Sequence, residues 1–167
     1  MECLLFRHGI AVAREGWHGE DAQRPLTKKG ENRVRQAAEG LVTLNIRATH
    51  ILTSPFLRAH ETAQILYHVL KVKTSPRICD ELIPDSPPDK VFPLLATLPN
   101  DATVMCVGHE PHLSEAASLM LFGKPTAALS MKKAGVCLIT FAESPRPGRG
   151  LLEWWMPPSY IRALRVG

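Results

Sequence analysis

The chain has 167 residues, of which 45% are hydrophobic and 22% are charged, and its formal net charge at pH 7 is +4. This length suits one domain with a sound core, so we expect a single domain over residues 1–167. No apolar run approaches the roughly 20 residues that a membrane span needs. The basic residues are interleaved with acidic ones, whereas nucleic-acid binding favours a basic face with aromatics. We therefore expect neither a membrane nor a nucleic acid as a partner.

The N-terminus and the cysteines both indicate a cytoplasmic protein. Residues 2–6 enter a strand-like segment at once, without the basic start and small-residue cleavage site of a signal peptide. The four cysteines each stand alone in an apolar stretch, and the chain has no Cys-x-x-Cys pair. This usage predicts buried reduced thiols rather than disulfides or a zinc site.

The predicted elements alternate between strands and helices along the chain. In chain order they are a strand at 3–6, a loop at 9–23, a helix at 28–44, a strand at 51–53, a helix at 57–70, a short strand at 76–79, a helix at 91–98, a strand at 103–107, a helix at 111–122, and strands at 136–141 and 151–156. Apolar residues recur at helical spacing in the helices, and Thr27 is placed to cap the first one. We expect an α/β fold: a three-layer α/β/α sandwich with a mainly parallel sheet and a C-terminal antiparallel hairpin.

Three segments that could carry chemistry each follow a predicted strand. Arg7-His8-Gly9 follows the first strand, Ser54-Pro55-Phe56-Leu57-Arg58 follows the second, and Gly108-His109-Glu110-Pro111 follows the strand at 103–107. In open α/β sheets, ligands bind at the carboxyl ends of the strands, where helix N-termini offer N–H groups to an anion. The pattern predicts that two arginines and two histidines converge on one phosphate-like anion.

These residue types suit phosphoryl transfer. Arg7 and Arg58 would stay charged and match phosphate oxygens with planar forks of donors, which stabilises the charge that spreads over a transferring phosphoryl group. A histidine that nearby arginines hold neutral can attack phosphorus through a ring nitrogen. His8 is the candidate nucleophile because Arg7 and Gly9 flank it at a strand end. The second histidine, His109, could hydrogen-bond a phosphate oxygen.

Together the motifs resemble the histidine phosphatase superfamily, also called the phosphoglycerate mutase-like fold. The residues that carry the resemblance are Arg7-His8-Gly9, Ser54-Pro55, Arg58-Ala59, Thr62-Ala63 and Gly108-His109. Closer still, the chain is similar to bacterial phosphohistidine phosphatases of the SixA type. That likeness rests on the short length, on Arg24-Pro25-Leu26-Thr27 with Gly30, and on the ending Trp154 through Pro157.

The resemblance implies roles for particular residues. His8 would be the phosphorylated nucleophile, and Arg7, Arg58 and His109 would complete the phosphate pocket. Ser54 and Arg24 are candidates for the pocket rim, with an ordinary surface role as the alternative. The resemblance implies no cofactor and no metal.

The general acid is expected at Glu81, which most closely resembles the position that protonates the leaving alkoxide in family members acting on phosphate esters. The Gly- and Trp-bearing stretch that often follows this position in the family is missing here. Asp80, Asp85 and Glu110 are possible substitutes. A catalytic acid must lie within hydrogen-bond reach of the leaving group, which geometry decides.

The short chain also bears on the substrate. Many mutases of the family are longer and wall in a small substrate with inserted helices, for which this chain has little room. A shallow site would admit a phosphate displayed on a protein, and an imidazole leaving group demands less of an enzyme acid than an alkoxide does. We therefore expect a phosphatase acting on protein phosphohistidine, for example on a histidine-phosphotransfer domain.

Other classes of function remain open. The chain could be a phosphatase or mutase acting on small phosphorylated substrates, or a non-catalytic module that binds phosphate groups. It could also be a metallohydrolase that uses His8, His109 and His112, although Arg7 and Arg58 would repel a cation.

Overall fold

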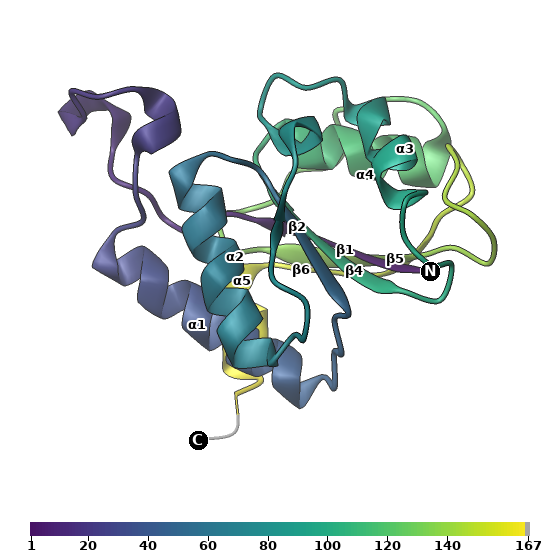
Figure 1. The fold of residues 1–167 in the computed structure, drawn as a ribbon, viewed down its shortest axis with the longest axis horizontal. Coiled ribbons are helices and arrows are strands. Elements are labelled where there is room, and N and C mark those ends of the chain that lie inside the picture. The colour runs from purple at the N-terminus through teal and green to yellow at the C-terminus, as the bar shows by residue number, and fades with distance from the viewer. Residues whose placement is uncertain (166–167) are drawn as a thin grey trace.

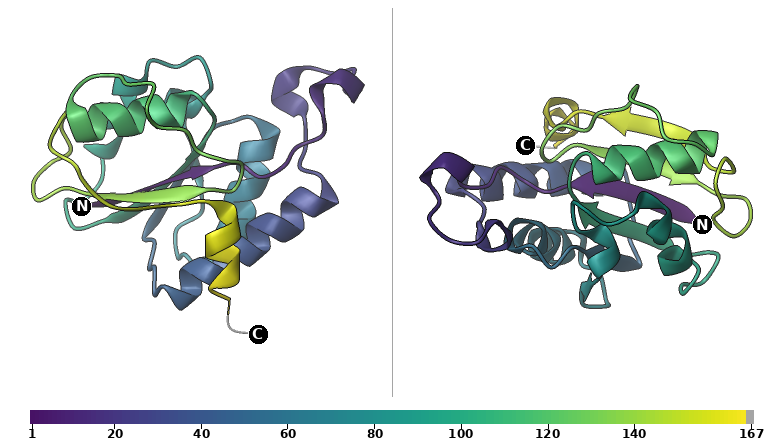
Figure 2. Two further views of the ribbon diagram at one scale, coloured as in Figure 1. Left: turned by 180° about the vertical axis from the view of Figure 1, so that it is seen from behind. Right: turned by 90° about the horizontal axis from the view of Figure 1, so that it is seen from above.

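The structure, a computed structural model that describes residues 1–165, has a six-stranded sheet between two layers of helices (Figure 1). Helices α1, α2 and α5 cover one face of the sheet, and α3 and α4 cover the other (Figure 2). The strands are β1 (Glu2–Arg7), β2 (His50–Thr53), β3 (Arg77–Ile78), β4 (Thr103–Gly108), β5 (Val136–Thr140) and β6 (Leu151–Met156); the helices are α1 (Lys28–Thr43), α2 (Leu57–Leu70), α3 (Val91–Leu95), α4 (His112–Phe122) and α5 (Pro158–Ala163). The predicted three-layer α/β architecture is confirmed.

The sheet has the order β3-β2-β4-β1-β5-β6. Its first four strands are parallel, whereas β5 runs antiparallel to β1 and pairs with β6 as a hairpin. In this register Arg7 lies beside Gly108, and Thr53 lies beside Val107. The three segments singled out in the sequence therefore leave neighbouring strands at the same edge of the sheet.

Successive side chains of β1 point to opposite faces of the sheet, and the core has one half on each face. Cys3 and Leu5 pack toward α3 and α4, while Leu4 and Phe6 pack toward α1 and α2, and all four are fully buried. A strand that is apolar on both faces is typical of a parallel sheet covered on both sides. The four cysteines are buried and free, as their spacing predicted.

The start of α1 is fixed by its cap and by a close approach of the backbone. The Thr27 side chain accepts a hydrogen bond from the Gly30 N–H at 3.0 Å, which confirms the predicted cap. Gly30 packs directly on the backbone carbonyl of Ile10, where any side chain would clash. Glycine is therefore required there, and the contact holds the loop that follows His8 against α1.

Some boundaries differ from the prediction. Helix α3 ends at Leu95, three residues early, and β3 has only two residues at the sheet edge. Helix α5 was not predicted, because Ile161 is its only buried residue and the sequence shows no helical period there. It is held by packing on α1, where Gly40 leaves room for the Ile161 backbone. None of the helices within residues 1–165 has the length and apolar character to cross a membrane.

Candidate active site

A pocket of about 470 Å³ opens at the sheet edge where β1 and β4 end. Its lining residues are Arg7, His8, Ala11, Arg14, Asp21, Arg24, Phe56, Arg58, Pro84, Asp85, His109, Glu110 and Lys133. Five of the predicted site residues thus meet around one cavity: Arg7, His8, Arg24, Arg58 and His109. They come from three strand ends and from the loop after β1. The loop is the purple segment that extends beyond the sheet in Figure 1.

His8 is buried and held as a single tautomer. Its Nδ1 lies 2.7 Å from the Gly9 carbonyl oxygen. Because a carbonyl can only accept, Nδ1 must carry the proton, and Nε2 is left with the lone pair. Burial, together with the charges of Arg58 and Arg7, lowers the pKa of His8 to about 3. The ring is therefore neutral at physiological pH, with its free nitrogen on the Arg58 side.

Arg58 is oriented by contacts on every side of its guanidinium. Its Nε donates to Nε2 of His8 at 3.3 Å, and its two terminal nitrogens donate to the Asp21 carbonyl at 2.7 Å and the Asp21 carboxylate at 3.0 Å. The ring of Phe56 lies 5.0 Å from the guanidinium carbon. The helix α2 thus delivers a positive charge directly to the nitrogen of His8 that holds the lone pair.

Thr62 joins this helix to the loop after β1. Its hydroxyl donates to the Arg58 carbonyl at 2.7 Å, one turn earlier in α2, and accepts from the Gly9 N–H at 3.1 Å. The contact fixes the distance between the backbone of His8 and the helix that carries Arg58.

Arg7 approaches the pocket from the end of β1. One of its terminal nitrogens donates to the Met131 carbonyl at 2.6 Å. Its Nε is buried and has no hydrogen-bond partner within residues 1–165. A buried donor without a partner is costly, so this group is placed to bind a ligand oxygen.

His109 lies beside His8, with 5.0 Å between the ring centroids. Burial is the largest cause that lowers the pKa of His109 to about 2, and the neighbouring His8 and the charge of Arg58 act in the same direction. Its Nε2 is 2.9 Å from the Ser54 hydroxyl, and its Nδ1 is buried without a partner in the described part of the chain. Ser54 is fully buried and does not line the pocket, which corrects its expected place at the rim.

Arg24 lies at the rim, as expected, and is tied to the loop. It donates to the Asp21 carboxylate at 2.8 Å and to the Val12 carbonyl at 2.6 Å. Burial alone would raise the pKa of Asp21, but hydrogen bonds and charge from Arg24 and Arg58 lower it. Asp21 is therefore a carboxylate that positions the two arginines and a poor proton donor.

Glu81 is not in the pocket, which corrects its expected place. It belongs to a single 3-10 turn, Asp80–Leu82, and lines a separate groove with Arg77 and Lys90. The physical reason is the burial of Leu82, which anchors this turn in the core and leaves Glu81 on the groove side. Asp80 is also absent from the pocket lining, whereas Asp85 and Glu110 are part of it.

Of these two carboxylates, Glu110 is the more fixed. Its Oε2 accepts a hydrogen bond from the Ser114 hydroxyl at 2.6 Å, and its Oε1 is buried without a partner within residues 1–165. Asp85 is exposed at the mouth. Sequence reasoning missed Asp21, Arg14 and Lys133 as site residues, because they lie in single 3-10 turns or in a loop turn, which show no period or motif.

The three histidines of a metallohydrolase are not assembled. His112 is fully buried in the first turn of α4 and does not line the pocket. Across residues 1–165, no three His, Cys, Asp or Glu side chains are arranged to hold a metal ion.

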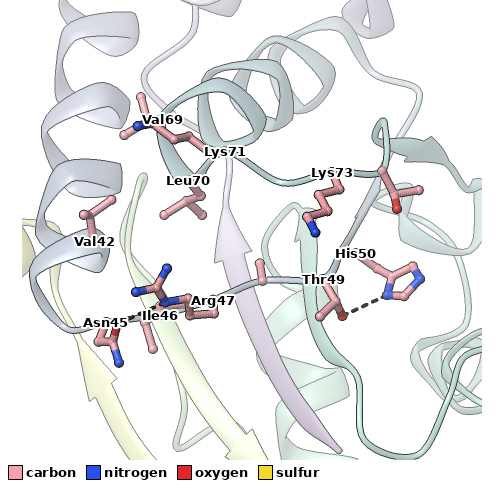
Figure 3. A pocket seen from close by; sticks show the side chains of 12 residues that line it. Val42, Asn45, Ile46, Arg47, Thr49, His50, Val69, Leu70, Lys71 and Lys73 are labelled. Carbon is pink, nitrogen blue, oxygen red and sulfur yellow. Dashed lines mark hydrogen bonds between the residues drawn. The ribbon is translucent and has the colours of Figure 1, made fainter.

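A larger pocket, of about 650 Å³, lies where β2 begins, at the C-terminal ends of α1 and α2 (Figure 3). It contains none of the predicted site residues. Its basic side chains, Arg47, Lys71 and Lys73, follow the helix ends, where a positive charge offsets the helix dipole. The clustered imidazoles and guanidiniums all belong to the smaller pocket at the other end of the strands.

Because His8 and His109 are neutral in the folded protein, we expect the fold to lose stability in acid. The folded-state pKa values of His8 and His109, about 3 and about 2, lie below the unfolded value of about 6.5. Between these pH values the unfolded chain binds more protons, so the free energy of unfolding falls as the pH drops below 6.5, by up to about 1.4 kcal/mol per pH unit for each histidine. Urea unfolding at several pH values from 7.5 to 4.5 measures this slope. We expect a shallower slope for His109→Gln and an unchanged one for the exposed control His68→Gln; equal slopes for all three would contradict the assignment.

Comparison with known proteins agrees with this geometry. A family model described as the histidine phosphatase superfamily (branch 1) matches residues 3–83, which include Arg7, His8 and Arg58. The chain is 40% identical over 141 residues to an uncharacterized protein of Picosynechococcus sp., covering 81% of this chain and 82% of that one. It is 27% identical to the phosphohistidine phosphatase SixA of Escherichia coli K12 over 99% of both chains.

Its structure is also similar to that of the protein histidine phosphatase SixA solved in complex with tungstate. The TM-score is 0.85 at 27% identity, over 96% of this chain and 99% of that one. The similarity therefore extends over the sheet, both helical layers and the pocket edge.

Proposed function

Because this chain belongs to the histidine phosphatase superfamily and is a phosphatase of that type, we propose that it hydrolyses phosphohistidine in a protein, with His8 as the phosphorylated nucleophile. The observation that carries the proposal is the neutral ring of His8. Its unprotonated Nε2 lies in a pocket that also holds Arg7, Arg58 and His109.

In the first step, the lone pair of His8 Nε2 attacks phosphorus, and the bond from phosphorus to the substrate nitrogen breaks. The ring of His8 gains positive charge as the new bond forms, and the hydrogen bond from Nδ1 to the Gly9 carbonyl stabilises that charge. In the structure, the Nε–H of Arg58 donates to Nε2 of His8. When Nε2 bonds to phosphorus, this N–H donates to a phosphoryl oxygen instead. Arg7 offers its unpartnered Nε to another.

In the second step, the oxygen of a water molecule attacks phosphorus and the bond from phosphorus to Nε2 of His8 breaks. Its electron pair returns to Nε2, and inorganic phosphate leaves with the oxygen of that water, whose proton passes to phosphate or solvent. His109 assists as a neutral donor. The Ser54 hydroxyl accepts the Phe56 N–H at 3.3 Å, so its own proton is free to bond Nε2 of His109. That arrangement puts the remaining ring proton on Nδ1, which has no partner within residues 1–165 and can donate to a phosphate oxygen.

The carboxylates of the pocket favour a leaving group that needs little acid catalysis. Asp21 is held ionised by two arginines, Asp85 is exposed, and Glu110 accepts a hydrogen bond from Ser114. Glu81 is outside the pocket. An imidazole that takes a proton from water or substrate can depart neutral, whereas an alkoxide needs a positioned acid. A relative from Escherichia coli K12, 27% identical over 99% of both chains, is named phosphohistidine phosphatase SixA.

Rates measured side by side test the substrate. We expect kcat/KM for a phosphorylated histidine-phosphotransfer domain to exceed that for 3-phosphoglycerate and for a phosphoserine peptide by about 100-fold or more. The reason is that the two phosphate esters have an alkoxide leaving group, whereas phosphohistidine has an imidazole. The assays are run with and without EDTA, and the rates are expected to agree. A preference for either phosphate ester would overturn the substrate assignment, and a rate abolished by EDTA would overturn the metal-independent mechanism.

A further inference from the structure

The turn before β5 is built onto the residues that carry the chemistry. The Ala134 N–H donates to the carbonyls of both Arg7 and His8, at 3.0 and 3.2 Å, and the Arg7 N–H donates to the Gly135 carbonyl at 3.1 Å. The Arg7 side chain adds a fourth bond, to the Met131 carbonyl. Residues 131–135 are therefore fixed relative to His8, although about 125 residues separate them in sequence.

The conformation of this turn places Lys133 at the pocket. The Gly135 N–H closes the turn on the Lys132 carbonyl at 2.7 Å, and Ala134 has a φ of 59°, a left-handed conformation that is costly for a residue with a side chain. The contacts with β1 hold it there. Both lysines are exposed, but Lys133 lines the pocket and its neighbour Lys132 does not.

Lys133 is uncommitted, unlike Arg7, Arg24 and Arg58. Arg58 and Arg24 are bound by Asp21, and Arg7 is bound by the Met131 carbonyl. Within residues 1–165 the Lys133 ammonium forms no ion pair. Partial burial, followed by the charges of Arg7, Arg24 and Arg58, lowers the pKa of Lys133, and its own charge in turn lowers the pKa of His8.

We propose that Lys133 is a phosphate-binding residue of this pocket, whose ammonium contacts the oxygens of the phosphoryl group before and after transfer to His8. The Lys133 ammonium is repelled by Arg7, Arg24 and Arg58 until an anion binds among these charges. A bound phosphate therefore removes an unfavourable interaction as well as making a favourable one. The flexible stem of a lysine lets one charge follow the phosphoryl group along its path. Arg58, tied to Asp21, has less freedom to do so.

Calorimetric titration with inorganic phosphate tests the binding claim directly. We expect Lys133→Met to weaken phosphate binding about tenfold or more, Lys133→Arg to keep most of the affinity, and the matched control Lys132→Met to bind as the wild type does. Thermal unfolding checks that each variant is folded. If Lys133→Met does not fold, Lys133→Gln takes its place in the titration. Wild-type affinity in a folded Lys133→Met or Lys133→Gln protein would overturn the proposal.

The role of Lys133 during turnover rests on the proposed function, and a second measurement keeps the two apart. Single-turnover labelling should show slower phosphorylation of His8 in Lys133→Met than in Lys132→Met. If the wild type never carries label on His8, the proposed mechanism fails while the phosphate titration still decides the binding role of Lys133. If His8 is labelled equally fast in both variants, Lys133 has no part in transfer.

Discussion

We expect the His8→Ala variant to take up no phosphoryl group and to lose at least about 10⁴-fold in turnover. The reason is that the lone pair on Nε2 of His8 is the attacking electron pair, and the alanine side chain has none. Arg7, Arg58 and His109 remain in the variant, so it should still bind inorganic phosphate. Quenched-flow mixing with a labelled histidine-phosphotransfer domain measures phosphoryl uptake and turnover together. In the wild type, the acid-labile label on His8 forms before free phosphate appears.

The matched control is His68→Ala, which removes an exposed imidazole at the far end of α2. It should be labelled and turn over as the wild type does. Label retained by His8→Ala, or wild-type label that maps to another residue, would remove His8 from the nucleophile role. Phosphate binding without turnover in the wild type itself would instead favour the non-catalytic binding module.

The fold could be predicted from the sequence because its signals are local. Apolar runs such as Leu4 to Phe6 indicate strands buried on both faces, and the spacing of Val34, Ala38 and Leu41 indicates a helix packed on one side. The α5 helix gave no such signal, since Ile161 alone is buried and the contact that holds it lies on a distant helix. Helix formation there is a consequence of tertiary packing.

Part of the site could be predicted for a geometric reason. The carboxyl ends of parallel strands meet at one sheet edge, so residues directly after a strand, such as His8 and His109, come together whatever their separation in sequence. The same reasoning misplaced Glu81. It follows the two-residue edge strand β3, and the turn that carries it is oriented by the burial of Leu82.

The remaining site residues depend on loops whose path the sequence does not reveal. Asp21 reaches Arg58 only because the loop after β1 folds back over the start of α2. Lys133 is one of two adjacent lysines, and their order in the turn, rather than their chemistry, decides which one faces the pocket. Ser54 and His109 were both found by motif, but the hydrogen bond between them could be identified only from the structure.

We expect Arg58→Lys to lose about 10²- to 10³-fold in kcat/KM even though it keeps the positive charge. The guanidinium donates at once to His8, to the Asp21 carbonyl and to the Asp21 carboxylate. An ammonium cannot reproduce this planar fork, so the donor that stabilises the transferring phosphoryl group would lose its direction.

Steady-state kinetics and phosphate titration together measure this effect. The control is Arg47→Lys, because Arg47 is exposed and lies at the opposite end of the sheet. This variant should turn over at the wild-type rate. Arg58→Ala should be slower still, and millimolar guanidinium ion should restore part of its rate by occupying the vacated space beside Asp21. If Arg58→Lys instead matches the wild type, charge alone at this position suffices, and the argument from the fork of donors is wrong. Rescue by guanidinium but not by ammonium would show that the phosphoryl group is recognised through the geometry of these N–H groups.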